Sequence, residues 1–260
     1  MSIKITTELV KELRDRTGVS VMQCRNALEE AGGDMEKALI ILKKKSSTIA
    51  MKKADRVAGD GIVVAHLLNN KAIILTLHCE TDFVARNEDF TKLANTLADT
   101  GINEGLDAMK VKSPEMINEV IQKVGEKIEL GEVEELEGTT LGSYVHGGKS
   151  AVVVSLTSGT PELAKDIAMH IAAMKPAFTT REEITEEDKK KVEEVFEKEV
   201  AESDKPEDIK KKMLEGKIAT YFKEQTLIDQ PFIKNPDVTI GKLLADNSAT
   251  LIKFIRVSIS

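Results

Sequence analysis

The sequence predicts an α+β protein, and three observations support this fold class. First, the N-terminal part has apolar residues at helical spacing. Second, two pairs of apolar strands each precede a helical pattern. Third, a segment rich in Glu and Lys interrupts the chain after the second of these strand-and-helix units. We therefore expect a three-helix module with a basic linker at 1–54 and a first core subdomain at 55–140. A second core subdomain is expected at 141–180 and 228–260, with an antiparallel helical hairpin inserted at 181–227.

Composition excludes several classes of function. The chain has 260 residues, 31% of them charged, and a net charge of −7, which argues against a protein that binds nucleic acid through a basic face. Its apolar runs are shorter than the ~18–20 residues that cross a membrane. Cys24 and Cys79 lie far apart without a secretory signal, so we expect free thiols in a reducing, cytoplasmic location.

The N-terminal module begins with a helix from about Thr7 to Arg16, which Gly18 ends. Ser20 and Gln23 have the spacing of a capping box at the start of a second helix. Asp34 is the expected N-cap of a third helix that buries Ala38, Leu39 and Leu42. The inner face of the second helix is expected to hold Val21, Cys24, Ala27, Leu28 and Ala31.

A basic connector follows the module, with Lys43-Lys44-Lys45, Lys52-Lys53 and Arg56. Few apolar residues accompany these charges. We favour a solvated linker helix, with a patch that docks on an acidic partner surface as the alternative.

The core subdomains repeat one pattern about 80 residues apart. Strands Ile62–Leu67 and Ala72–Cys79 flank an Asn-Asn turn and precede a helix at 88–100, and a further helix is expected over 114–128. The second copy has the strand Gly142–His146, a Gly-Gly turn, a second apolar strand and a helix. This repetition indicates two related subdomains from an internal duplication.

The last third of the chain contains the predicted helical hairpin and a final strand. Apolar residues form a narrow seam along the charged segment 181–227, and Pro206 lies in the break between its two helices. Such a hairpin buries little area by itself, so we expect it to project and meet a second protein. Residues 251–259 are expected to return as a strand to the second subdomain.

Phe83 is the most informative single residue. It follows Asp82 at the junction between the strand ending at Cys79 and the helix that starts near Glu88. The chain has only seven Phe, two Tyr and no Trp. An aromatic ring at such a tip is either a plug in the protein's own core or a wedge that enters a partner, and the residues alone favour the plug.

Several motifs are similar to enzymatic sites but lack the residues or the geometry that those sites require. Gly147-Gly148-Lys149-Ser150 is similar to a phosphate-binding loop, but that motif needs Gly where Ser143 stands and leads into a helix rather than a strand. His78 and Cys79 are neighbours on a strand, so their side chains point to opposite faces and cannot easily form a catalytic pair.

The remaining candidates are equally weak. His170 lies on an apolar helix and is expected to be a packed core histidine, and the four His and two Cys lack metal-ligand spacing. We therefore expect no cofactor, no metal site and no covalent catalysis. A thiol-dependent enzyme that uses Cys79 stays open as a minor alternative.

Motifs along almost the whole chain resemble those of the bacterial elongation factor Ts family. These factors exchange guanine nucleotide on the translational GTPase elongation factor Tu. The similar segments are Leu9–Gly18, Thr81–Ala85, Leu141–Tyr144 with His146-Gly147, Met169–Ala173 with Lys175-Pro176, and Gln230–Phe232. The resemblance implies a ubiquitin-associated-like fold for the N-terminal module.

The resemblance also implies a site. In the family an Asp-Phe pair inserts into the nucleotide domain of the GTPase and disturbs its Mg²⁺ site; here the pair is Asp82 and Phe83, flanked by Thr81 and Val84. Further contact positions, by resemblance, are Arg25, where the family often has Lys, and Val124, Gly125 and His146.

The implied partner is elongation factor Tu in its GDP-bound and nucleotide-free forms, with no direct nucleic acid and no membrane. The segment 181–227 resembles the one that forms a dimer contact in some members, which leaves a homodimer or a 2:2 complex open. A second class of function is a non-catalytic adaptor, in which residues 4–45 bind a partner and the core is a scaffold.

Overall fold

The computed structural model describes residues 5–259, and these residues form an α+β fold with ten α-helices and small antiparallel sheets. The chain divides into two compact units. The first contains residues up to 135 together with 145–151 and 257–260, and the second contains 136–144 and 152–256. None of the helices in the described part is long and apolar enough to cross a membrane.

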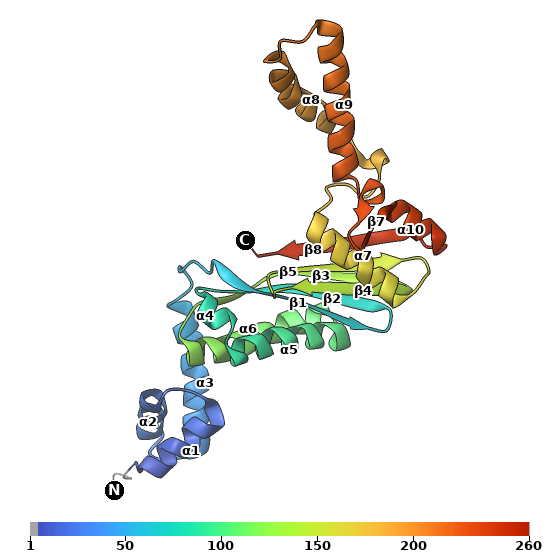
Figure 1. The fold of residues 1–260 in the computed structure, drawn as a ribbon. Coiled ribbons are helices and arrows are strands. Elements are labelled where there is room, and N and C mark those ends of the chain that lie inside the picture. The colour runs from blue at the N-terminus through green and yellow to red at the C-terminus, as the bar shows by residue number, and fades with distance from the viewer. Residues whose placement is uncertain (1–4, 260) are drawn as a thin grey trace. The chain divides into compact units, whose positions relative to one another are not determined.

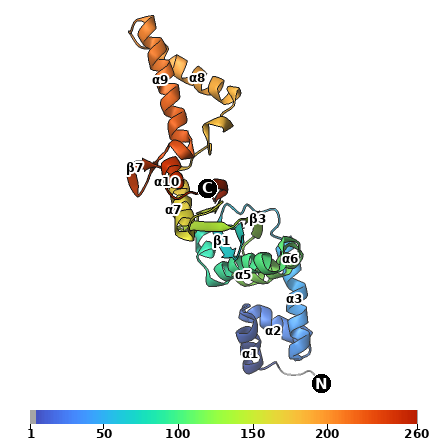
Figure 2. The same ribbon diagram turned by 90° about the vertical axis from the view of Figure 1, so that its right-hand side faces the viewer.

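The first unit begins with three helices, α1 (Thr7–Thr17), α2 (Val21–Glu30) and α3 (Met35–Met51). Gly18 ends α1 in the left-handed conformation at φ 70°, and Asp34 caps α3 by accepting from the Lys37 amide, as the sequence predicted. Their shared core contains Val10, Leu13, Val19, Cys24, Ala27, Leu28, Ala38 and Leu42. Figure 2 shows these helices as a bundle from which α3 continues toward α6.

Two expectations for α2 are wrong. Val21 is 56% exposed rather than buried, because it lies in the first turn beyond the reach of the bundle core. Ser20 does accept from the Gln23 amide, but the Gln23 side chain accepts from the Gln122 side-chain amide at 3.2 Å. The capping box is therefore half formed, since its second partner is used to hold α2 against α6.

The central strand of the first sheet is β2 (Lys71–Cys79), buried along most of its length. It pairs with β1 (Asp60–Leu68) in the predicted hairpin, whose turn places Asn69 at φ 54°. On its other side lies β3 (Ile128–Glu137), which the sequence did not predict. Five glutamates occupy β3, and this charge hides the strand pattern.

One face of this sheet is covered by α5 (Glu88–Glu104) and α6 (Leu106–Val124), which lie side by side in Figure 1. The expected helix over 114–128 was wrong at both ends, because α6 starts earlier, contains Pro114 and stops at Gly125. Residues from β2, α5 and α6 share the main core of this unit, with Phe90, Leu97 and Met109 fully buried.

The second unit is built on a sheet with the order β4-β5-β8: β4 (Thr140–His146), β5 (Ser150–Leu156) and β8 (Leu251–Ser258). All three strands were predicted. The helix α7 (Pro161–Met174) packs so closely on β4 that a Cβ at Gly142 would lie 2.4 Å from the Ala164 carbonyl carbon.

His170 on α7 is fully buried, which confirms the expected core histidine. Its Nε2 lies 2.9 Å from Gln230 Oε1, and its Nδ1 accepts from the Ile233 amide at 3.3 Å. The Gln230 side-chain amide in turn donates to the Glu224 carbonyl at 2.6 Å. This buried chain of hydrogen bonds ties α7 to the end of α9.

The predicted hairpin consists of α8 (Glu186–Ala201) and α9 (Glu207–Gln225), which Figure 2 shows as two helices. The loop 202–206 joins them, and Pro206 at its end is the N-cap of α9. Short elements not seen in the sequence flank it: the 3₁₀ turns Arg181–Glu183 and Leu227–Asp229, β6 (Pro231–Phe232), β7 (Asn235–Thr239) and α10 (Ile240–Asp246). They are too short to give a clear period in the sequence.

Candidate functional site

The tip between β2 and α5 contains a four-residue helix, α4 (Asp82–Ala85). Thr81 precedes it with extended backbone, and its hydroxyl accepts from the Val84 amide at 3.4 Å as an N-cap. Asn87 then caps α5 by accepting from the Asp89 amide. Two caps within seven residues turn the chain sharply between β2 and α5.

The side chains of α4 divide into two sets. Val84 and Ala85 are buried in the main core of the unit, whereas Phe83 is 83% exposed. The plug interpretation of Phe83 is therefore wrong within this chain. Full burial of a Phe side chain stabilises a folded protein by about 1.5–3 kcal/mol relative to an exposed one. Phe83 makes no such contribution to the folding of this chain.

Asp82 lies beside the exposed ring and forms a surface ion pair with Arg86 at 3.1 Å, one helical turn later. The Asp82 side chain is 48% exposed and that of Arg86 is 81% exposed. Such exposed pairs contribute only about 0.3–0.5 kcal/mol. The Asp82 carboxylate can therefore be withdrawn from Arg86 at small cost to meet another cation or amide.

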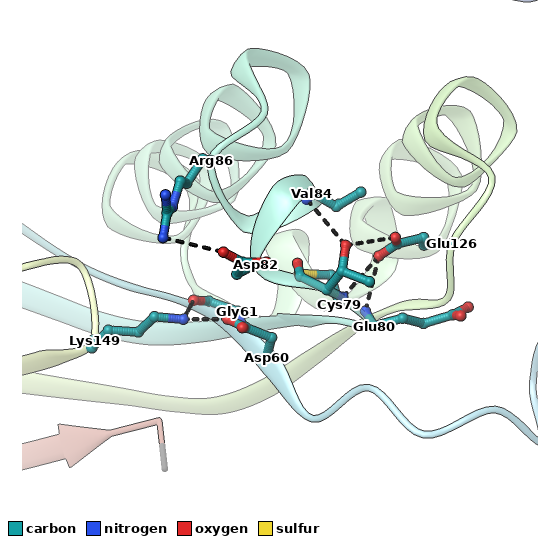
Figure 3. Close-up of polar contacts among 10 residues, drawn as sticks. Asp60, Gly61, Cys79, Glu80, Asp82, Val84, Arg86, Glu126 and Lys149 are labelled. Carbon is teal, nitrogen blue, oxygen red and sulfur yellow. Dashed lines mark hydrogen bonds and ion pairs between the residues drawn. The ribbon is translucent and has the colours of Figure 1, made fainter.

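The base of the tip is held by Glu126, as Figure 3 shows. One carboxylate oxygen accepts from the amides of Glu80 at 3.1 Å and Thr81 at 3.0 Å, and the other accepts from the Thr81 hydroxyl at 2.7 Å. In return, Glu80 accepts from the Lys127 amide at 2.6 Å. This bond, with Arg56 adding to it, holds the pKa of Glu80 below its usual value.

The basic connector reaches the same region. Lys53 donates to the Gly125 carbonyl at 2.5 Å, and Arg56 pairs with Glu80 at 3.2 Å. Lys43, within α3, pairs with Glu115. The first part of the connector is thus the end of α3, and these three cations have acidic or carbonyl partners within the chain.

Val124 and Gly125 lie next to the tip, because they directly precede Glu126. Val124 is the last residue of α6, and Gly125 caps the helix at φ 78° with open space around the position of a Cβ. The structure thus brings these two predicted residues together with Thr81–Val84. An exposed glycine backbone at this point leaves room for a partner to approach closely.

His146 is exposed at the end of β4, and its carbonyl accepts from the Lys149 amide at 3.0 Å. The Lys149 side chain pairs with Asp60 and donates to the Gly61 carbonyl at 2.9 Å. Asp60 lies opposite Cys79 in the hairpin, and the nearby Lys149, with a smaller effect from Arg86, lowers the pKa of Asp60. Figure 3 shows this pair beside the pair of Asp82 and Arg86.

Arg25 lies on α2 rather than at the tip, and among the described residues no contact joins it to Thr81–Val84. Its guanidinium pairs with Glu29 at 2.9 Å and stays 64% exposed. Val21 and Met22, one turn earlier, are 56% and 67% exposed. The α2 surface therefore presents two apolar side chains next to a cation.

Cys79 beneath the tip is a buried free thiol, and it donates to the Thr81 carbonyl at 3.2 Å. Burial, together with the charges of Asp60 and Glu126, raises its pKa to about 12. Such a thiol is protonated at neutral pH and is a poor nucleophile. Within residues 5–259, no group of three or more His, Cys, Asp or Glu is placed to hold a metal ion.

The sequence reasoning missed Glu126, Glu80, Asp60 and Lys149. These residues are far apart in the chain and sit among many other charged residues, and the local motif around Lys149 points only to the rejected phosphate-binding loop. Only the fold brings their side chains to the ends of β1, β2 and α6. A Glu directly after a Gly C-cap is the one signal that could have pointed to Glu126.

Comparison with known proteins then decides the family. The family model described as Elongation factor TS matches residues 80–260, beginning at the residue that precedes Thr81. The chain belongs to the elongation factor Ts family. Elongation factor Ts of Thioalkalivibrio sulfidiphilus is 41% identical over 98% of the chain and 92% of that protein.

Two further relatives support the assignment. Elongation factor Ts of Nitrosospira multiformis is 42% identical over 95% of the chain and 87% of that protein, and that of Aeromonas salmonicida is 39% identical over 98% and 90%. Membership of the elongation factor Ts family supports a role as a translation elongation factor.

Proposed function

We propose that this protein is a guanine-nucleotide exchange factor for elongation factor Tu in translation elongation. The observation that carries the proposal is the 83% exposure of Phe83 on a helix whose next two residues are buried. A large apolar ring in water, held by a short anchored helix, suits insertion into another protein. Family membership supplies the partner, and it supports a cytoplasmic location.

In this proposal Asp82 and Phe83 act on the nucleotide site of the GTPase. Such sites hold GDP through backbone amides around the phosphates and through Mg²⁺ that bridges phosphate and protein oxygens. Because Mg²⁺ requires nearly ideal octahedral geometry, a small displacement of the surrounding ligands sharply weakens the binding of the ion, and with it the binding of GDP. Phe83 supplies the displacing volume, and the weakly paired Asp82 carboxylate competes for amides or cations.

Exchange of this kind needs no covalent step. The factor stabilises the empty GTPase more than the GDP-loaded one. By linkage the effect is reciprocal: bound GDP lowers the affinity of the GTPase for the factor by the same ratio by which the factor lowers its affinity for GDP. A coupling of ~4 kcal/mol speeds GDP release up to roughly a thousandfold if it acts wholly on dissociation. The high pKa of Cys79 argues against the thiol-dependent alternative.

Other predicted contacts extend the proposed interface. Val124, Gly125 and His146 would flank the tip, and Gly125 offers an open backbone position. Arg25, with the exposed Val21 and Met22, would form a separate contact on α2. We assign the tip to GDP release and α2 to affinity, which leaves the adaptor activity as one part of the same function rather than an alternative to it.

The proposed domain assignment follows the family. Residues 1–54 would form the ubiquitin-associated-like module with its linker. The first core subdomain would be 55–140, the second would combine 141–180 with 228–260, and 181–227 would be the inserted hairpin. Exposed Val195 and Ile209 on α8 and α9 favour self-association of that hairpin into a homodimer or a 2:2 complex. Sedimentation of the protein alone and with elongation factor Tu decides between these states.

Replacement of Phe83 by Ala tests the proposed function. We expect Phe83→Ala to slow stimulated release of labelled GDP from elongation factor Tu by at least about tenfold, since the loss of a buried Phe at an interface costs about 2 kcal/mol or more. The free energy of unfolding should change by less than about 0.5 kcal/mol, because the ring is exposed.

Val111→Ala is the matched control, since Val111 is an equally exposed apolar residue on α6, at 81%. It should leave GDP release unchanged. Equal rates for Phe83→Ala and Val111→Ala, with both proteins folded, would show that the ring takes no part in exchange.

A further inference from the structure

Glu80 and Glu126 exchange hydrogen bonds between the ends of β2 and α6. Glu126 accepts three, from the amides of Glu80 and Thr81 and from the Thr81 hydroxyl. The Glu80 carboxylate accepts one from the Lys127 amide, so each segment supplies a carboxylate to the backbone of the other. We call these two residues the carboxylate clamp.

The clamp meets a need created by the shape of the tip. The amides of Glu80 and Thr81 lie after the end of β2 and before α4, so neither regular element supplies their acceptors. An amide left without a partner costs about 1–3 kcal/mol when it is shielded from water. Bonds from amides to an ionised carboxylate are about twice as strong as neutral ones.

The clamp also orients the cap of α4. The Thr81 hydroxyl has one hydrogen, which it donates to Glu126, so its lone pairs are left to accept from the Val84 amide. A four-residue helix is far below the length that is stable by itself. The path from Glu126 through Thr81 to the start of α4 therefore fixes the turn that carries the exposed Phe83.

We propose that Glu126 is a positioning residue for nucleotide exchange, which presets Phe83 for insertion; this rests on the proposed function. A ring that is already fixed pays less conformational entropy when it enters a partner. Loss of the clamp leaves the tip as an ensemble in which only a fraction is competent for insertion, and the rate of GDP release falls to that fraction of its original value.

Glu126→Gln tests the assignment, because it keeps the size of the side chain but replaces one acceptor oxygen by an NH₂ donor. The matched control is Glu129→Gln, the same change three residues later, which removes an ion pair with the Lys127 side chain and leaves the carboxylates of Glu80 and Glu126 in place. Stimulated GDP release from elongation factor Tu is measured over a range of factor concentrations. Amide hydrogen exchange of Glu80 and Thr81 is measured on the factor alone.

We expect Glu126→Gln to lower the maximal rate about tenfold while the half-saturating concentration stays within about twofold, because other surfaces form the complex. Exchange of the Glu80 and Thr81 amides should speed up at least about tenfold. Glu129→Gln should match wild type in both measurements. If Glu126→Gln does not fold, Glu126→Asp replaces it in the test with the same expectations. This variant keeps the negative charge but has a side chain that is shorter by one methylene group.

The outcomes separate the two proposals. A wild-type chain that leaves GDP release unchanged overturns the proposed function and this role of Glu126 with it. A wild type that accelerates release, with Glu126→Gln equal to it in maximal rate, overturns only the positioning role. A variant that is merely less stable, with an unchanged maximal rate per folded molecule, also overturns it.

Discussion

His170 shows how one buried side chain joins distant parts of the second unit. It lies on α7, accepts from the Ile233 amide and reaches the α9 terminus through Gln230. These bonds fix the neutral ring with its proton on Nε2, since Nδ1 faces an N–H donor. Burial lowers the pKa of His170, because a charged ring in this core would lose its hydration.

This lowered pKa makes the stability depend on pH. In the unfolded chain the ring binds a proton below about pH 6.5, whereas in the folded protein it stays neutral to lower pH. The contribution is therefore complete above that pH, and it is lost as the pH falls toward the folded pKa. We expect the free energy of unfolding to fall between about pH 7.5 and 5.5 more steeply in wild type than in His170→Gln.

Urea unfolding of both proteins at the two pH values measures this difference. His170→Gln is expected to be less stable overall but flatter in pH, because it lacks the titrating ring. Parallel pH profiles for the two proteins would mean that other groups cause the dependence.

Among the elements of the second unit, β4 and α7 pack backbone against backbone at Gly142. A Cβ at Gly142 would lie 2.3 Å from the Lys165 amide nitrogen and 2.4 Å from the Ala164 carbonyl carbon, and a backbone cannot yield as a side chain can. We expect Gly142→Ala to destabilise the protein by about 1–3 kcal/mol or more, measured as a shift of the urea midpoint.

Gly216→Ala provides the opposite case on α9. Its Cβ would meet nothing within 4 Å, and the residue lies inside a helix. Ala loses less backbone freedom there, so this change should stabilise the helix by about 0.5–1 kcal/mol. A destabilised Gly216→Ala would show that α9 packs against something beyond this chain.

The elements also show where sequence patterns reach their limit. Hairpins, long amphipathic helices and caps were predictable, because Asn69, Gly18 and Asp34 act on their own neighbours. The strand β3 was not, since it is stabilised by pairing with β2 and its glutamates obscure the alternation. Val21 was placed inside because its spacing fits, but the first turn of α2 extends past the core.

The candidate site was predictable only in part. Family motifs located Thr81–Val84, and the structure placed Val124 and Gly125 beside them. The exposure of Phe83 depends on the tertiary fold, because the same motif would fit a buried ring. Glu126 was missed because its role depends on a meeting of segments 45 residues apart.

At the scale of the whole molecule, the proposed interface uses two surfaces with different tasks. In this proposal the tip acts on the nucleotide site of the GTPase, and the α2 surface holds the partner. We expect Met22→Glu to raise the half-saturating concentration in GDP release about tenfold, since burial of a Met is worth about 1.5–3 kcal/mol. The maximal rate should stay within about twofold, because the tip is untouched.

Ile40→Glu is the control for this prediction, since Ile40 on α3 has the same 67% exposure as Met22. It should leave both kinetic parameters unchanged. A loss of maximal rate in Met22→Glu without a change in half-saturation would contradict the division between the two surfaces.

The arrangement around Phe83 also bears on how the free protein stays dispersed. An exposed ring invites aggregation when other apolar groups surround it. Here Val84 and Ala85 turn inward, and the charged Asp82 and Arg86 border the ring as gatekeepers. Contact between two tips would strip water from these charged groups before the rings could touch, so the ring is left for a partner that offers a slot of its own.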